Sequence, residues 1–277
     1  MRLDELDAEL GAVPGTVSVY CGRIGVPPVY VRNADVTHYA ASTVKVSILV
    51  ALHLAAEEGR LSLDEPISVH NGFRSAVDGS PFGCTRGYDN DGAVWERLGG
   101  TATPRWLAER MIVRSSNLAT NLVLAQVGTE SADGAWRLAG ASHSTTGRGI
   151  EDYAADAAGI TNLVTAADLA AILTGIATGT VASAASCRAM LATLLAQEGT
   201  QDLAAGLPPG TRIAHKNGWI DGVRHGAGVV FPDDAPPYAL AVCTTTPLAV
   251  NDADDEACRL LARIAAASWA QRRHPIG

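Results

Sequence analysis

A serine is followed three residues later by a lysine in the S-x-x-K segment that runs from Ser42 to Lys45. The residues after Ser42 carry apolar side chains at helical spacing, so a helix is expected to begin there. Three residues make about one helical turn, which places the hydroxyl and the amine on one face. A desolvated lysine is partly neutral near pH 7 and can then activate a serine nucleophile. The alternative is an N-cap serine followed by a solvated lysine.

Two further polar motifs follow this pair along the chain. The first is S-x-N, formed by Ser115 and Asn117 between two helical segments. The second is K-x-G, from Lys216 to Gly218, at the end of a predicted strand. A lysine, a small polar residue and a glycine supply a positive charge, a side-chain donor and close backbone approach to a ligand. Taken singly, S-x-N is also explained by a helix N-cap, and K-x-G by a turn at the end of a strand.

The composition narrows the class of protein. The chain has 277 residues, 47% of them apolar, and a formal charge of −8, which argues against nucleic-acid binding. No apolar run is long enough to cross a bilayer, and the first residues lack the features of a secretory signal, so a cytoplasmic protein without a membrane partner is expected. Five scattered cysteines show no ligand spacing, which predicts free thiols and neither a metal nor another cofactor.

The predicted elements define an α/β (α+β) fold. Strand signals near both ends predict one antiparallel sheet flanked by terminal helices, with an all-helical lobe inserted between them. Residues 1–40 and 205–277 would form the sheet lobe, and residues 41–204 the helical lobe that carries S-x-x-K and S-x-N. Within the helical lobe, helices are predicted at 43–58, 104–113, 116–127, 165–178 and 183–196, and the candidate N-cap residues are Ser42, Thr103, Thr165 and Ser183.

Two long polar loops interrupt the helical lobe. One covers about 70–103 and the other, an Ω-type loop, about 143–162; both are long enough to suggest a functional role. The first loop carries aromatic residues that would either form a wall over a site or pack beneath the loop itself. These residues are Phe73, Phe82, Tyr88 and Trp95.

The three motifs, in this order and in these settings, resemble the signature of the class A serine β-lactamase and penicillin-binding-protein superfamily, S-x-x-K, S-D-N and K-T-G. The resemblance extends over nearly the whole chain, including the turn from Gly59 to Glu65. It implies the β-lactamase/transpeptidase-like fold. The chain departs from the signature at two central positions, where Ser116 stands for aspartate and Asn217 for threonine or serine.

The resemblance implies a catalytic role for each matched residue. Ser42 is the nucleophile that forms an acyl-enzyme, and Lys45 is the base or its electrostatic partner. Ser115 passes a proton to the leaving group, helped by the charge of Lys216. Asn117 holds a substrate amide.

The resemblance also implies how a substrate is held. The reacting oxygen would lie between the backbone N–H groups of Ser42 and Trp219. Lys216 and Asn217 would bind a substrate carboxylate, and Arg224 and His225 on the following strand are candidates to add to that charge. Arg224 could equally be an ordinary solvated strand residue. The substrate-binding residues implied on this part of the chain are Asn217, Gly218, Trp219, Arg224 and His225.

Hydrolysis also requires a water molecule activated against the acyl-enzyme. In class A enzymes a glutamate within E-x-x-x-N orients that water, and Glu151 lies at the matching place after S-x-N, where Arg148 could anchor the loop. The asparagine of that pattern is Ala155 here. Glu151 would therefore be the water-activating residue or an ordinary loop carboxylate, and without it deacylation would be slow.

These observations leave several functions open. The first is an acyl-serine hydrolase that opens β-lactam amides, acting on a small molecule with a carbonyl and a carboxylate. The second is a cytosolic esterase, amidase or acyl-transferase of metabolism or natural-product biosynthesis on the same scaffold. A non-catalytic ligand-binding relative is a third, which the joint presence of the motif residues disfavours. A serine-dependent glutaminase shares S-x-x-K but suits the K-x-G strand less well.

Overall fold

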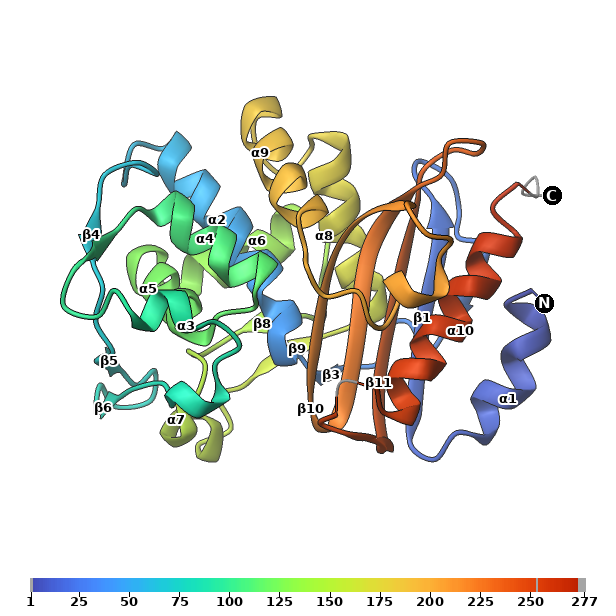
Figure 1. The fold of residues 1–277 in the computed structure, drawn as a ribbon, viewed down its shortest axis with the longest axis horizontal. Coiled ribbons are helices and arrows are strands. Elements are labelled where there is room, and N and C mark those ends of the chain that lie inside the picture. Colours follow the sequence, from blue (N-terminus) through green and yellow to red (C-terminus); the bar gives the residue numbers. More distant parts are fainter. Residues whose placement is uncertain (1, 253, 274–277) are drawn as a thin grey trace.

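Strands from both ends of the chain form one antiparallel sheet, as expected (Figure 1). The computed structural model describes residues 2–252 and 254–273. The sheet order is β10-β11-β1-β2, so the N-terminal hairpin joins the C-terminal strands through the β1–β11 pair. The four strands are β1 (Thr16–Arg23), β2 (Tyr30–Arg32), β10 (Arg212–Phe231) and β11 (Tyr238–Val250).

Strand β10 turns back on itself at Gly222, whose φ of 80° suits a glycine. The residues after this turn pair with β11. Gly228 in the returning half lies against the first half, because a Cβ there would come within 2.7 Å of the Cβ of His215 and 2.8 Å of the carbonyl oxygen of Ala214. The K-x-G motif therefore lies in the outer half of β10, at the edge of the sheet that faces the helical lobe (Figure 1).

The sheet separates two hydrophobic cores because successive side chains of a strand point to opposite faces. On β11, Leu240 and Val242 belong to the core shared with the terminal helices, whereas Ala241 and Cys243 belong to the core shared with the helical lobe. Helices α1 (Asp7–Ala12) and α10 (Glu256–Ala270) cover the outer face, and α8 (Ala166–Thr178) packs on the inner face (Figure 1).

Helix α2 (Lys45–Glu57) lies at the centre of the helical lobe. Ten of its thirteen residues are buried, so it is enclosed on all sides rather than along one stripe. The predicted helices of this lobe are present, but the helices at 92–95, 129–138 and 153–157 were not predicted. The surrounding helices are α3 (Gly92–Trp95), α4 (Pro104–Val113), α5 (Asn117–Val127), α6 (Thr129–Leu138), α7 (Tyr153–Ala157) and α9 (Ala184–Leu195).

Three of the four predicted N-caps are confirmed by side-chain hydrogen bonds: Thr103, Thr165 and Ser183 each accept one from the backbone three residues on. The prediction for Ser42 was wrong. Ser42 lies inside a 3₁₀ helix, Ala41–Val44, that leads directly into α2. Its backbone is therefore already helical, which leaves its hydroxyl free of any capping role.

The two long loops contain only short elements and are joined to each other. The first holds the hairpin of β5 (Phe73–Arg74) and β6 (Pro81–Phe82). The buried carboxylate of Asp152, in the second loop, accepts hydrogen bonds from the Ser75 hydroxyl at 2.6 Å and the Ala76 N–H at 2.8 Å. The remaining short strands are β3 (His38–Tyr39), β4 (Ile67–Ser68), β7 (Thr101–Ala102), β8 (Thr145–Thr146) and β9 (Asn162–Val164).

The division into lobes at residues 40/41 and 204/205 stays a prediction. What the fold establishes is that the first half of β10 lies directly against the start of α2, with many contacts between β10 and the 3₁₀ helix. The S-x-x-K and K-x-G motifs, far apart in the sequence, are thereby brought to one place.

Candidate active site

The backbone of Gly218 lies against the backbone of Ser42. A Cβ at Gly218 would be 2.7 Å from the Ser42 amide nitrogen and 3.0 Å from that of Thr43. Only glycine permits this approach, because any side chain would displace the start of α2. The amide groups of Ser42 and of Trp219, the residue after Gly218, are consequently neighbours, as an oxyanion site between them requires.

Lys45 is completely buried, so the alternative of a solvated lysine is excluded. Its amine donates to the Ser115 carbonyl at 2.7 Å, to the Ser115 hydroxyl at 3.2 Å and to Asn117 Oδ1 at 2.9 Å. The motif at Ser115–Asn117 thus supplies all three of the acceptors that an ammonium group needs. The first two sequence motifs meet at this amine.

Lys216, on strand β10, contacts the same hydroxyl. Its amine donates to Ser115 Oγ at 3.1 Å and to the Asn217 carbonyl at 2.7 Å. Ser115 adopts a φ of 57°, which is uncommon for a residue with a side chain and is typical of functional sites. The strained backbone holds the hydroxyl between two lysine amines, so the third motif joins the first two.

Burial lowers the pKa values of both lysines. Burial lowers the pKa of Lys45 to about 7, against a smaller opposing effect of the Asp89 carboxylate. Burial also lowers the pKa of Lys216 well below its ordinary value, and the nearby charge of Lys45 adds to this. Two positive charges on one hydroxyl in a buried site are unfavourable. A neutral amine beside Ser115 is therefore accessible at physiological pH.

The signature has an aspartate at the central position of its second motif, where this chain has Ser116. An aspartate from the 70–103 loop, Asp89, contacts Ser116 instead. The Ser116 hydroxyl donates to Asp89 Oδ2 at 3.2 Å, and the Leu118 N–H donates to the same oxygen at 2.9 Å. A carboxylate is favourable at this helix N-terminus. Sequence reasoning missed Asp89, whose only signal was an acidic residue in a polar loop.

Glu151 lines the same pocket as Ser42. Both of its carboxylate oxygens accept a hydrogen bond from the Thr85 N–H, at 3.1 and 2.9 Å, and its φ is 66°. Arg148 anchors the loop from inside, where its guanidinium pairs with Asp156 at 2.8 Å and donates to the Tyr39 hydroxyl at 3.0 Å. The loop thus holds a carboxylate at the pocket wall.

The pocket at Ser42 has a volume of about 540 Å³. Of the four aromatic residues of the 70–103 loop, Tyr88 lies on its wall, whereas Phe73 and Trp95 are buried and Phe82 packs against Phe73. The interpretation of an aromatic wall therefore holds for Tyr88 alone. The lining residues are Tyr39, Ala41, Ser42, Gly87, Tyr88, Asn90, Asn117, Arg148, Ile150, Glu151, Tyr153, Asp156, Trp219, Ile220 and Asn251.

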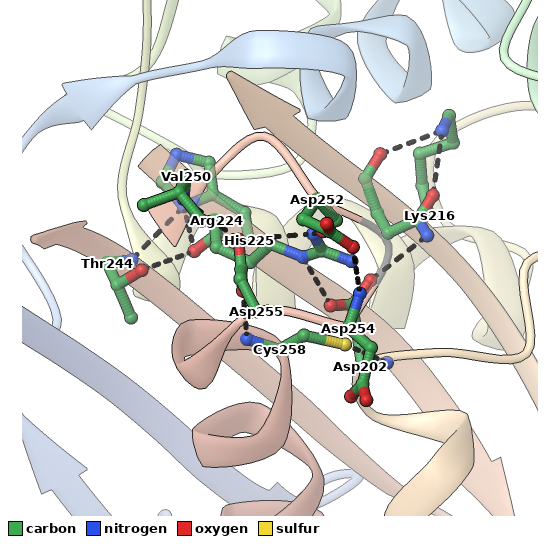
Figure 2. A network of polar contacts seen from close by, with 11 residues as sticks. Asp202, Lys216, Arg224, His225, Thr244, Val250, Asp252, Asp254, Asp255 and Cys258 are labelled. Carbon is green, nitrogen blue, oxygen red and sulfur yellow. Dashed lines mark hydrogen bonds and ion pairs between the residues drawn. The ribbon is translucent and has the colours of Figure 1, made fainter. Parts of the chain in front are cut away.

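The structure does not bring Arg224 or Asn217 to this pocket, contrary to expectation. Arg224 is 1% exposed, and its guanidinium donates to Asp202 Oδ1 at 2.6 Å and to the Asp252 carbonyl at 2.6 Å (Figure 2). Asn217 is also buried and donates to Asp202 Oδ2 at 3.1 Å. The loop before β10 and the start of α10 cover these side chains, so they face protein rather than pocket.

His225 is likewise enclosed, and the expectation that it adds charge for a substrate was wrong. It is completely buried, and burial lowers its pKa. Its Nε2 lies 2.8 Å from the Tyr39 carbonyl, and its Nδ1 lies 3.1 Å from the Thr244 N–H that donates to it. Both ring nitrogens are therefore engaged by the backbone, and the ring serves packing between β10 and β3.

The five cysteines are buried free thiols, as expected. Among residues 2–252 and 254–273, no group of histidine, cysteine and acidic side chains is arranged to hold a metal ion. Within the same residues, no helix has the length and apolar character needed to cross a membrane.

The comparisons with known proteins agree with this site. A model of the beta-lactamase enzyme family matches residues 2–271. The structure of PBP-A is 24% identical with a TM-score of 0.79, covering 97% of this chain and 96% of PBP-A. The beta-lactamase from Sphaerobacter thermophilus DSM 20745 is 23% identical with a TM-score of 0.79, covering 97% of this chain and 95% of its own. No curated protein matches the chain in sequence.

A third similar structure is a single-substitution mutant of the class A beta-lactamase of the last common ancestor of Gram-negative bacteria. It is 23% identical, with a TM-score of 0.83 over 99% of this chain and all of the other. Fold and site together define a serine hydrolase that resembles class A β-lactamases and acts on small molecules. The chain belongs to the beta-lactamase enzyme family.

Proposed function

We propose that Ser42 attacks the carbonyl carbon of an ester or amide and that the protein hydrolyses the resulting acyl-enzyme. The observation that carries this proposal is the position of the Ser115 hydroxyl, 3.2 Å from the amine of Lys45 and 3.1 Å from that of Lys216. Burial keeps a neutral amine available at this hydroxyl, so a base for Ser42 exists one helical turn away.

In the acylation step, Ser42 Oγ forms a bond to the carbonyl carbon while its proton passes to the Lys45 amine. The negative charge that develops on the carbonyl oxygen is stabilised by the backbone N–H groups of Ser42 and Trp219. The bond to the leaving group then breaks, and Ser115 gives its proton to the leaving atom. Ser115 regains a proton from the Lys45 ammonium, so the protons balance.

In the deacylation step, Glu151 takes a proton from a water molecule as its oxygen attacks the acyl carbon. The ester bond to Ser42 breaks, the proton that Glu151 took is returned to Ser42 Oγ, and a free acid leaves with Glu151 again a carboxylate. This assignment is supported by the position of Glu151 on the wall of the pocket that Ser42 lines. With Ala155 in place of a second ligand for the water, deacylation is expected to be slower than acylation.

A β-lactam amide is one substrate that such a site would open. A similar structure, a single-substitution mutant of PBP-A, is described as an acyl-enzyme complex with penicillin G. The second candidate is an esterase or amidase for other acyl groups, or an acyl-transferase. It is favoured by the burial of Asn217 and Arg224, which removes the expected binding groups for a β-lactam carboxylate from the pocket.

Burst kinetics separate the two candidates. A chromogenic cephalosporin and p-nitrophenyl butyrate should be compared on the same preparation, with Ser42→Ala as the matched control. A β-lactamase would turn over the cephalosporin, whereas an esterase would turn over the butyrate and show at most a stoichiometric burst with the cephalosporin. Release of neither chromophore above the Ser42→Ala rate would contradict both.

A further inference from the structure

A carboxylate of the protein itself occupies the donors that were expected to bind a substrate carboxylate. Asp202, in the loop between α9 and β10, is 1% exposed. Its Oδ1 accepts from Arg224 Nε at 2.6 Å (Figure 2). Its Oδ2 accepts from Asn217 Nδ2 at 3.1 Å. The two oxygens therefore bridge the arginine and the amide of the K-x-G motif.

The site around Asp202 is closed by further contacts. The Asp202 N–H lies 3.4 Å from Cys258 Sγ, and the φ of Asp202 is 59°, a conformation that few residues with side chains adopt. A backbone held in this conformation on a buried residue indicates that the surrounding structure fixes it. The carboxylate is thus a permanent part of the network drawn in Figure 2.

The positive charge of Arg224 is already neutralised by carboxylates of the protein. Besides Asp202, the carboxylate of Asp255 lies 3.6 Å from its Nη1, so two buried negative charges face one guanidinium. The amine of Lys216 donates to the Asn217 carbonyl and the Ser115 hydroxyl, and burial lowers its pKa well below the ordinary value. A substrate carboxylate placed beside Arg224 would be buried next to two carboxylates that already neutralise the guanidinium, which is strongly unfavourable.

The pocket wall also disfavours an anion. Among the described residues that line it, the charged ones are Arg148, Glu151 and Asp156, two negative and one positive. Arg148 is already paired with Asp156 at 2.8 Å. The rest of the wall is neutral and includes the rings of Tyr39, Tyr88, Tyr153 and Trp219. The surface therefore suits a neutral acyl donor with apolar or aromatic groups.

We propose that Asp202 determines specificity by filling the carboxylate site from within, so that Ser42 acylates with neutral esters or amides and not with carboxylate-bearing ones. This inference rests on the proposed function. It names the substrate class: an uncharged acyl donor in which no carboxylate stands near the scissile bond. The residue acts through Asn217 and Arg224 and does not touch the reacting atoms.

Benzylpenicillin and its methyl ester form a matched pair of probes, because they differ only in the charge at the carboxyl group. Binding should be measured by calorimetry in the Ser42→Ala background, where no acylation occurs. The expected result is a Kd about tenfold lower for the methyl ester, equivalent to about 1.4 kcal/mol. Tighter binding of the free acid would overturn the proposal without the need for any further variant.

Asp202→Asn, added to the same background, removes the charge with little change in shape. It should tighten binding of the free acid about tenfold and leave the methyl ester within about twofold, which changes the preference by about 1.4 kcal/mol. Asp252→Asn is the control, since Asp252 contacts Arg224 only through its backbone carbonyl. An equal effect of Asp252→Asn would attribute the change to long-range charge and overturn the proposal, as would an unchanged preference in Asp202→Asn.

The proposed function is judged separately, by acylation of the unsubstituted chain with p-nitrophenyl butyrate. Absence of an adduct on Ser42 would contradict the function while the ratio of the two dissociation constants still decides the role of Asp202. An adduct together with a preference for the free acid would contradict the role of Asp202 alone.

Discussion

Asp89 Oδ2 accepts a hydrogen bond from the hydroxyl of Ser116 at 3.2 Å, although the two residues belong to different segments of the chain. The same oxygen caps the N-terminus of α5 through the Leu118 N–H. The S-x-N motif therefore receives its carboxylate from the 70–103 loop. This loop is consequently part of the candidate active site, because it contacts the turn that carries Ser115.

Replacing Asp89 by asparagine should shift the pH dependence of acylation to lower pH. The Asp89 carboxylate raises the pKa of Lys45, so its removal lets Lys45 lose its proton at lower pH. The midpoint of this pH dependence is obtained by measuring the rate of acylation by p-nitrophenyl butyrate between pH 5 and pH 9. This range covers about two pH units on each side of the Lys45 pKa of about 7.

Asp91→Asn is the matched control for this prediction. Asp91 belongs to the same loop but pairs with Arg110 and caps α3, so its loss should lower stability and leave the midpoint unchanged. A midpoint that stays the same in Asp89→Asn, or moves equally in Asp91→Asn, would show that Asp89 does not act on Lys45.

In the unsubstituted protein, acylation of a neutral ester should rise with pH through about 7 and then level off. Burial lowers the pKa of Lys45 to about 7, and only the deprotonated amine accepts the proton of Ser42. Lys45→Arg keeps a positive charge but cannot lose it. It should slow acylation by about 10²–10⁴-fold and abolish the rise near pH 7. An unaltered pH profile in Lys45→Arg would rule out Lys45 as the base.

Two adjacent carboxylates should respond differently to removal of their charge. Glu151→Gln should slow deacylation by about 10²–10⁴-fold, so that an acyl-enzyme accumulates, because the water loses its base. Asp152→Asn should leave deacylation nearly unchanged but lower the free energy of unfolding by about 1.5–3 kcal/mol, since Asp152 joins the two loops through Ser75 and Ala76.

Single-turnover mass spectrometry measures the deacylation rates, and urea unfolding measures the stabilities. Deacylation that is equally fast in Glu151→Gln would show that another group activates the water. Much slower deacylation in Asp152→Asn would instead show that the position of the loop, rather than the Glu151 carboxylate alone, controls the deacylation rate.

The meeting of the three motifs was implied by the family resemblance, whereas the sheet and most helix starts were predicted from local patterns. Alternating strands at the two ends and the capping residues Thr103, Thr165 and Ser183 are such patterns, and the structure contains them. The failure at Ser42 has a local cause: residues three apart lie on one face in both a 3₁₀ helix and an α-helix, so the pattern does not show where one becomes the other.

The sequence could not predict Asp89, Asp202 or the burial of Arg224, because these depend on contacts between distant segments. Arg224 and Asp202 are 22 residues apart and meet only because the loop before β10 folds over the sheet. A strand arginine in the sequence is equally compatible with solvent, substrate or a buried ion pair. Asn217 and Arg224 were expected from the resemblance to face a substrate, and in the structure both donate to Asp202.

Intact-protein mass spectrometry after a short reaction with p-nitrophenyl butyrate tests the central claim most directly. We predict a mass increase of one butyryl group per chain, located on Ser42 by peptide mapping and absent from Ser42→Ala. The adduct should decay in the unsubstituted protein and persist in Glu151→Gln. An unmodified chain, or an adduct that remains in Ser42→Ala, would contradict the assignment of Ser42 as the nucleophile.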